Sequence, residues 1–339
     1  MTDSSIIFNR KKVKYTLLDE VLTTNLDNKT VNVIIDSRTL FDIFYIEFYH
    51  NIIPDLVKDS NNTVAELFNF IGHYHNYFRK KFSNTNVKFT IIYNSQEDNR
   101  EKDGLTIWDK KKAKGLKLAY INFVLKKAKT MTKYFKNISI IDGNGIDNHL
   151  IPLVLLENED INYKDHAIFI TDDEFFFQYS KYFNSFNLLK ASNSIAKVYN
   201  KNEYWKFVYE KNSYKIKEDQ VLINDDITVA SFLAYKGYED IVPIVSLKSK
   251  QLITFFEKNY FANKNSYIFE LAKNIDETEF NKRHAILNIE YRNEDILAED
   301  RTLITSQVNK ATKNSNNILY DLNAKSFNEV IALSFLLDI

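Results

Sequence analysis

The sequence predicts an α/β protein with a mostly parallel central sheet flanked by helices, followed by a helical C-terminal part. Short runs that are apolar at successive positions alternate with longer helical patterns over the first two thirds of the chain, as in buried parallel sheets. Three of these runs end on acidic residues, at Asp36, Asp142 and Asp173. Because ligands of such sheets bind beyond the carboxyl ends of the strands, we expect these carboxylates to converge on one edge.

Composition excludes several classes of site. The 339 residues carry no net charge and are 45% hydrophobic, which fits one large or two modest soluble domains. The absence of cysteine excludes disulfides, thiolate catalysis and cysteine-ligated metals. The six glycines form neither a GxGxxG nor a GxxxxGK[ST] loop. No signal peptide or membrane span is evident, so we expect a cytoplasmic protein with no membrane partner. The abundance of Asn, Lys, Ile, Tyr and Phe is typical of an AT-rich genome, such as that of a phage or a low-GC bacterium.

The first part of the chain predicts strands and helices in alternation. An extension at residues 1–30 carries a basic run. Pro54 ends the first helix, because the residue before a proline disfavours the helical conformation. The elements expected in order are a strand at Val31–Asp36, helices at Leu40–Ile53 and Val64–Phe82, a strand at Val87–Tyr93, a loop at Asn94–Asp103 and a basic helical segment at 110–136.

The alternation continues to about residue 215. Pro152 lies inside one predicted helix and is expected to shorten or kink it. The elements expected in order are a strand at Ile138–Ile141, a helix at about Asp147–Leu156, a strand at Ala167–Thr171, a helix at Glu174–Lys181, short strands or hairpin pieces at Phe186–Leu189, Ser194–Tyr199 and Trp205–Tyr209, and mainly helix from Ile227 onward.

One segment of this neutral chain is strongly basic. Residues 101–136 contain eleven lysines and three acids, a pattern that fits an electrostatic footprint for phosphate. A solvated helix face explains the same charges equally well. Apolar residues at near-helical spacing suggest an amphipathic helix with its lysines pointing outward, namely Leu116, Tyr120, Phe123, Val124 and Tyr134.

The order of motifs resembles the flap endonuclease-like branch of the PIN-domain nucleases, over roughly residues 31–260. In that family a first strand ends on a metal-binding Asp, and a second strand leads to a basic helical arch. A glycine then precedes clustered acids, and a further strand ends in Asp-x-Asp followed by Gln. Last comes a helix–loop–helix element that binds the backbone of duplex DNA. The matching segments here are IIDSRTLF, FTIIYNSQEDN with the lysines after it, DGNGIDNHLI, FITDDEFFFQ and FLAYKGYEDIVPIVSLKSKQLITFFEKN.

The resemblance implies a PIN-like nuclease domain at 31–215, with a basic arch at about 100–136, and a helical duplex-binding and C-terminal region at 216–339. It implies Mg²⁺ or Mn²⁺ as cofactor, with Asp36, Asp147 and Asp173 as catalytic metal ligands and Asp172 as a further ligand. Asp142 and Asp240 are outer candidates. The lysines implied to contact nucleic acid are Lys110, Lys111, Lys112, Lys114, Lys117, Lys126, Lys127, Lys236, Lys248 and Lys250.

The sequence also departs from the family pattern. The acid expected after the second strand falls at Asn94, the acidic cluster keeps Asp147 alone, and the second Asp of Asp-x-Asp falls at Phe175. Three or four carboxylates suffice for one Mg²⁺, whereas two ions would need more. Each acid also has a structural explanation as a helix cap or turn residue. His149, beside Asp147, is interpreted as incidental rather than as a metal neighbour.

Three hypotheses of function follow. The first is a divergent, Mg²⁺-dependent, structure-specific 5′ nuclease acting on branched or flapped DNA or on RNA primers. The second is a nuclease-fold protein that has lost this chemistry and serves as a nucleic-acid-binding or assembly subunit. The third is a phage structural or accessory protein whose motif order is coincidental.

Overall fold

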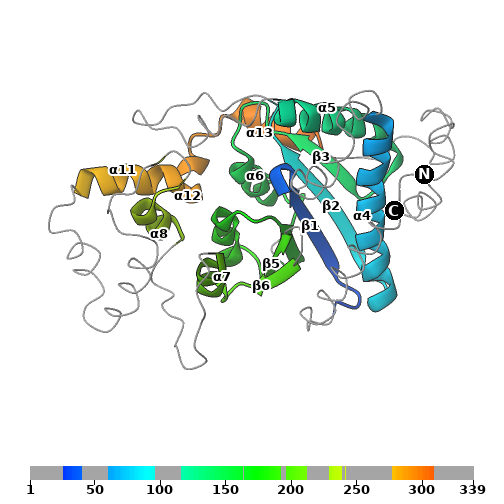
Figure 1. The fold of residues 1–339 in the computed structure, drawn as a ribbon, viewed down its shortest axis with the longest axis horizontal. Helices are drawn as coiled ribbons and strands as arrows, with labels where there is room; N and C mark the ends of the chain where they lie inside the picture. The colour runs from blue at the N-terminus through cyan, green and yellow to red at the C-terminus, as the bar shows by residue number, and fades with distance from the viewer. Residues whose placement is uncertain are drawn as a thin grey trace.

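A six-stranded sheet in the order β3-β2-β1-β4-β5-β6 forms the centre of the molecule (Figure 1). The computed structural model describes residues 26–39, 60–95, 116–162, 164–191, 196–211, 229–238, 241 and 277–308. The strands are β1 (Thr30–Asp36), β2 (Asn86–Tyr93), β3 (Ile138–Asp142), β4 (His166–Ile170), β5 (Ser185–Ala191) and β6 (Ala196–Asn200). The first five are parallel, and β6 pairs antiparallel with β5. The predicted α/β class with a mostly parallel sheet is therefore confirmed.

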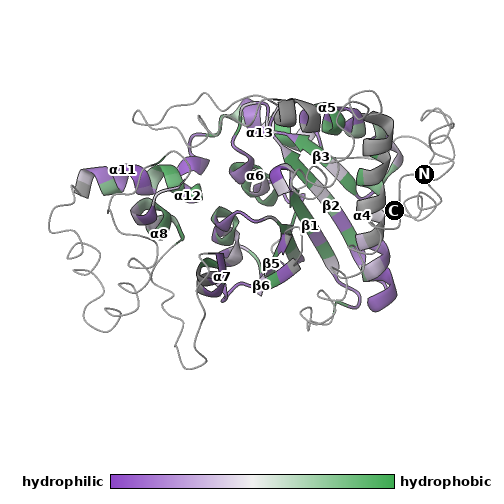
Figure 2. Ribbon diagram, viewed as in Figure 1, coloured by the Kyte–Doolittle hydropathy of each residue, from purple (hydrophilic) through white to green (hydrophobic). Residues whose placement is uncertain are grey.

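Both faces of the sheet are apolar and covered. In β1, Val33 and Ile35 pack into one hydrophobic core, and Ile34 between them packs into a second core on the other face. Successive side chains of a strand point to opposite faces, so the continuous apolar run supplies two cores at once. Figure 2 shows hydrophobic colour along much of β1, β2 and β3.

Two helices cover the first face, α4 (Ser60–Lys81) and α5 (Leu116–Met131). The buried side chains of α4 recur at intervals of three and four residues, which places them on one side of the helix. These core residues are Val64, Leu67, Phe68, Ile71, Tyr74 and Phe78. In α5, Val124 and Ala128 are buried and Lys126 is exposed, whereas Phe123, expected on the apolar side, is 54% exposed.

The second face carries shorter helices from later parts of the chain. The 3₁₀ helix at Asn148–Leu150 leads into α6, and another 3₁₀ helix forms at Glu174–Lys181. The α-helices on this side are α6 (Ile151–Glu157), α7 (Tyr204–Lys211), α8 (Val229–Lys236), α11 (Glu277–Leu287), α12 (Ile289–Asn293) and α13 (Ala298–Ser306). Among the helices that the structure describes, none has the length and apolar character needed to cross a membrane.

One predicted element is wrong. Trp205–Tyr209 was expected to be a strand or hairpin piece, because aromatic and β-branched residues favour strands. The segment instead lies in α7, whose buried residues Tyr204, Phe207 and Val208 have the spacing of a helix face. The helical period, not the propensity of single residues, decides the outcome here.

The α-helix that contains Pro152 is shorter at its start than predicted, because residues Asn148–Leu150 form a 3₁₀ helix. Pro152 lies in the first turn of α6, which begins at Ile151. The backbone nitrogen in the first turn has no acceptor within the helix, so a proline costs nothing there. The predicted helix Leu40–Ile53, most of the loop 94–103 and the lysines at 110–114, 248 and 250 lie outside the described residues.

Candidate functional site

The strand order reverses between β1 and β4. The chain runs outward from β1 through β2 to β3, then returns to the other side of β1 to form β4 and β5. Ligands of parallel sheets bind where the strand order reverses in this way, beyond the carboxyl ends of the strands. Asp36 is the last residue of β1, and Asp172 and Asp173 follow β4. The acids predicted from the sequence therefore lie at the expected position.

One guanidinium joins Asp36 and Asp173. Arg38 Nε lies 3.1 Å from Asp36 Oδ2, and Arg38 Nη2 lies 2.8 Å from Asp173 Oδ2. The Arg38 side chain is 29% exposed, whereas the two carboxylates are 1% and 9% exposed. The two predicted metal ligands are thus brought together, with an arginine of the same chain between them.

Asp173 accepts further hydrogen bonds at the same oxygen. Tyr238 Oη donates to Asp173 Oδ2 at 2.6 Å, and His149 Nε2 lies 2.9 Å from that atom. The other oxygen, Oδ1, accepts the backbone N–H of Phe175 at 2.9 Å and caps the 3₁₀ helix. The capping interpretation is therefore correct for Asp173, and it coexists with the charge contacts.

Asp147 is fully buried beside two cationic groups. Its Oδ2 accepts a hydrogen bond from Arg292 Nη1 in α12. Its Oδ1 lies 3.1 Å from His149 Nδ1 and also accepts the backbone N–H of His149 at 2.9 Å. His149 therefore connects Asp147 with Asp173. The interpretation of His149 as incidental is not supported by this geometry, because its ring lies buried between two carboxylates.

The protonation states follow from these neighbours. Burial raises the pKa of Asp147 and Asp173, but the nearby cations outweigh burial and hold both well below the ordinary value. Burial lowers the pKa of His149, and the two carboxylates more than reverse this effect. For Asp36, burial dominates over Arg38 and raises the pKa. The group is thus a buried set of three acidic side chains that face Arg38, His149 and Arg292.

Asp172 and Asp142 have other described neighbours than this group. Asp172 lies on the chain beside Asp173, and its described electrostatic neighbours are Lys190 and Lys211. Asp142 Oδ1 accepts the backbone N–H groups of Ser95 and Asn144 at the end of β3. Asp240 lies outside the described residues.

The predicted lysines are only partly described. Lys126 is exposed on α5 and Lys127 is half-buried. Lys236, at the end of α8, pairs with the buried Glu174. Lys117 lies in α5, but its side chain lies outside the described set. The nucleic-acid contacts expected from these residues stay predictions.

Asn94 and Phe175, where the family pattern has acids, both have structural roles. Asn94 Oδ1 accepts the N–H of Gly145 at 2.8 Å, and its Nδ2 donates to the carbonyl of Ile146 at 3.0 Å. The ring of Phe175 stacks on the imidazole of His149 with centroids 4.0 Å apart. Asn94 therefore stabilises the loop before Asp147, and Phe175 packs against the buried His149.

Sequence reasoning missed Arg38, Tyr238 and Arg292. Arg38 lies two residues after Asp36 in the first turn beyond β1, and that proximity was a usable signal. Tyr238 and Arg292 are 65 and 145 positions from the carboxylates that they contact. No local pattern relates residues at that separation.

The arrangement does not fit a divalent cation. Within the described residues, no group of three or more histidines and carboxylates is placed to hold a metal ion. The oxygens of Asp36, Asp147 and Asp173 face cationic side chains, which would repel Mg²⁺ from the same position. In this conformation the oxygens that would ligate an ion are already hydrogen-bonded.

Comparison with solved structures finds similar chains from a phage and from human. The chain is similar to the T5 D15 protein co-crystallised with metal ions, at 12% identity and a TM-score of 0.48, covering 86% of this chain and 99% of that one. It is similar to the bacteriophage T5 D15 flap endonuclease in complex with DNA and metal ions, at 12% identity and a TM-score of 0.38, covering 91% and 97%. It is also similar to human GEN1 in complex with Holliday junction DNA, at 11% identity and a TM-score of 0.42, covering 92% and 72%.

At such identities and TM-scores the likeness says nothing of what this chain binds or does. No protein-family model matches the chain, and no curated protein matches it.

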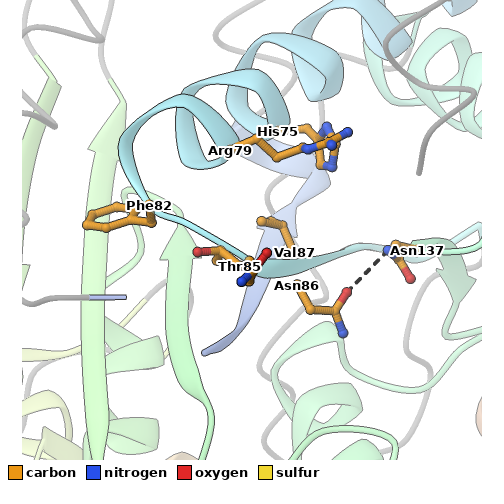
Figure 3. A pocket seen from close by; sticks show the side chains of 8 residues that line it. His75, Arg79, Phe82, Thr85, Asn86, Val87 and Asn137 are labelled. Carbon is orange, nitrogen blue, oxygen red and sulfur yellow. Dashed lines mark hydrogen bonds between the residues drawn. The ribbon is translucent and has the colours of Figure 1, made fainter. Parts of the chain in front are cut away.

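A separate pocket opens at the opposite edge of the sheet. It has a volume of about 670 Å³ and lies where α4 ends and β2 begins. Figure 3 shows His75 and Arg79 of α4 above Asn86 and Asn137, which are joined by a hydrogen bond of 3.3 Å. None of the predicted acids lines this pocket.

Proposed function

We propose that this chain is a nuclease-fold protein that binds nucleic acid and does not cleave it by a metal-dependent mechanism. The observation that carries the proposal is that each of the three predicted catalytic carboxylates is hydrogen-bonded to an arginine of the same chain. Arg38 contacts Asp36 and Asp173, and Arg292 contacts Asp147. A carboxylate neutralised in this way is stabilised by the protein itself and has no need of a divalent ion.

The departures at Asn94 and Phe175 support the same conclusion. Both positions are committed to loop and ring contacts, so neither is available as a ligand. Binding of nucleic acid is supported by the basic segment around α5, where Lys126 is exposed. Phosphate contacts by lysines require no metal and give binding that weakens steeply with salt.

A metal-dependent 5′ nuclease acting on branched or flapped DNA is the second candidate function. It is favoured by the meeting of Asp36 and Asp173 at the point where the strand order reverses. This candidate requires Arg38, the most exposed of the three cations, to leave the two carboxylates when Mg²⁺ or Mn²⁺ binds.

The two candidates are separated by one pair of measurements. A labelled 5′-flap DNA is incubated with the protein in Mg²⁺, in Mn²⁺ and in EDTA, and both anisotropy and product formation are followed. We expect salt-sensitive binding that is the same in all three solutions, with no product. Cleavage that requires the metal and disappears in the Asp36→Ala/Asp173→Ala double variant would establish the nuclease. Absence of binding at low salt would contradict both and favour an accessory protein.

A further inference from the structure

Two lysines, Lys190 and Lys211, lie over the ring of Phe207, and a third, Lys197, is the cross-strand partner of Lys190. Lys190 lies at the end of β5, Lys197 at the start of β6 and Lys211 at the end of α7. The Nζ atoms of Lys190 and Lys211 lie 5.5 Å and 5.7 Å from the ring centroid of Phe207. Lys190 and Lys197 are direct partners across the antiparallel pair of strands. We call these three residues the Phe207 lysine cluster.

The alternation of β5 puts Lys190 on this side of the sheet. Phe186 and Leu188 belong to the second hydrophobic core, which also contains Phe207. Lys190 is the next residue on that face, because side chains two apart in a strand point the same way. It comes where the core reaches the carboxyl edge, and its Nζ atom lies over the ring of Phe207.

Two of the three lysines in the cluster form ion pairs with carboxylates among the described residues, and one does not. Lys197 pairs with Glu210 at 2.5 Å, and Lys211 lies 3.5 Å from Glu174. Glu174 is shared, since Lys236 also pairs with it. Lys190 forms no ion pair with any of the residues that the structure describes.

Charges of both signs lie around Lys190. Burial lowers the pKa of Lys190, and the neighbouring ammonium groups of Lys211 and Lys197 lower it further, against the opposing effect of Asp172 and Glu210. Like charges placed directly opposite each other across two strands destabilise the sheet. The repulsion between Lys190 and Lys197 lowers the stability of the isolated protein. An anion bound between the two ammonium groups would remove that repulsion.

The cluster lies on the same edge as the buried acids. The backbone N–H of Thr171 donates to the carbonyl of Leu189 at 3.0 Å, so Lys190 follows immediately beside the turn that carries Asp172. Arg38, the most exposed cation of the acidic group, contacts Asp173 after the same strand. A strand that crosses the carboxyl edge of β4 and β5 would pass Arg38, Asp172 and Lys190.

We propose that the Phe207 lysine cluster binds a backbone phosphate of a nucleic-acid strand. This inference rests on the proposed function and names where the strand is held. Ammonium groups bind phosphate as point charges without reading sequence, so the expected contact depends on salt and is indifferent to bases. The aromatic ring fixes two of the lysine stems, which lowers the entropy lost when the phosphate is bound.

The test compares Lys190→Gln with Lys181→Gln. Lys181 is a matched control because it is 48% exposed, pairs with Glu290 and lies outside the cluster. Anisotropy with a labelled oligonucleotide is measured over a salt series. We expect Lys190→Gln to weaken binding roughly three- to tenfold and to reduce the slope of log K against log salt by about 1, the change for one lost phosphate contact. The control variant should bind as the wild type does.

Two further measurements keep the outcomes distinct. Thermal unfolding should show that Lys190→Gln is as stable as the wild type or slightly more so, whereas a purely structural lysine would give a loss. Competition with inorganic phosphate separates a strand contact from a free-anion site: a variant that loses phosphate binding while binding DNA normally overturns the proposal. Equal DNA binding by Lys190→Gln and Lys181→Gln also overturns it, and leaves the proposed function standing. Failure of the wild type to bind any nucleic acid overturns both.

Discussion

The guanidinium of Arg38 lies 2.8 Å from the carboxylate of Asp173, so a residue that follows β1 neutralises an acid that follows β4. The same guanidinium contacts Asp36. A cation supplied by the chain thus stands between the two carboxylates that were predicted to share a metal ion. The chemical character of this edge depends on whether that arginine stays in place.

Replacing Arg38 should uncover a weak cation site. In Arg38→Gln, Asp36 and Asp173 lose their shared positive neighbour, and we expect the free energy of unfolding to fall by about 1–3 kcal/mol. Mn²⁺ should then restore part of the lost stability, because an ion that binds only the folded state stabilises it. Thermal unfolding with and without Mn²⁺ measures both effects.

The control for this experiment is Arg79→Gln, which removes an exposed arginine at the opposite edge of the sheet. It should show no shift with Mn²⁺. A shift in the wild-type protein as large as in Arg38→Gln would mean that Arg38 does not exclude the ion.

Arg292 should be essential for stability through its contact with Asp147. The carboxylate is fully buried, and loss of one partner of a buried ion pair typically costs about 3–5 kcal/mol. Arg292→Met should show a loss of this size in chemical denaturation, and Asp147→Asn in the same chain should recover part of it. The double-mutant cycle isolates the coupling.

Arg301 offers the comparison, because it pairs with Glu157 and both side chains are at least 30% exposed. Arg301→Gln should cost less than about 1 kcal/mol. Comparable losses at positions 292 and 301 would contradict the assignment of Arg292 as the counter-charge of Asp147.

Asn94→Asp should destabilise the protein. The amide nitrogen that donates to the carbonyl of Ile146 would become a carboxylate oxygen facing that carbonyl, and we expect a loss of about 1–3 kcal/mol. Asn202→Asp, at an exposed turn, is the matched substitution and should be nearly neutral. If Asn94→Asp were as stable as the wild type and also bound Mn²⁺, position 94 would be a metal-ligand position. The role of Asn94 in stabilising the loop before Asp147 would then be contradicted.

His166 should make stability depend on pH between about 4 and 6.5. Burial lowers its pKa from 6.5 to about 4, while both ring nitrogens contact Ser185 and Asn187. As the pH falls through this range the unfolded chain takes up a proton that the folded protein does not. Stability therefore falls, by up to about 3 kcal/mol for a shift of this size.

The measurement is urea unfolding of the wild type and His166→Gln at several pH values, with a flatter profile expected for the variant. His284 has a pKa lowered in the same direction, so the difference between the two proteins is the informative quantity. His149 affects stability in another pH range, because its pKa is raised. Its contribution to the free energy of unfolding is complete below pH 6.5 and is lost only at higher pH. Parallel profiles for the two proteins would show that His166 does not titrate as assigned.

Much of the fold follows from local pattern. Alternating apolar runs and helical periods located the strands from β1 to β5 and the helices α4 and α6, since burial of a strand or a helix face leaves a repeating signature in the sequence. The position of Asp36 and Asp173 at one edge also followed, because parallel strands place their carboxyl ends together. Where two local signals disagreed, as in α7, propensity misled and periodicity was the better guide.

The sequence by itself thus determined the class of fold and the edge on which the acids lie. Only the tertiary structure decided which groups those acids meet, with Arg292 approaching Asp147 from 145 positions away and Tyr238 approaching Asp173 from 65. The reason is physical. Strands and helices leave periodic patterns among residues that are close in sequence. A buried charge is instead balanced by whichever side chain the packing brings near it, and the sequence separation between the two residues follows no period.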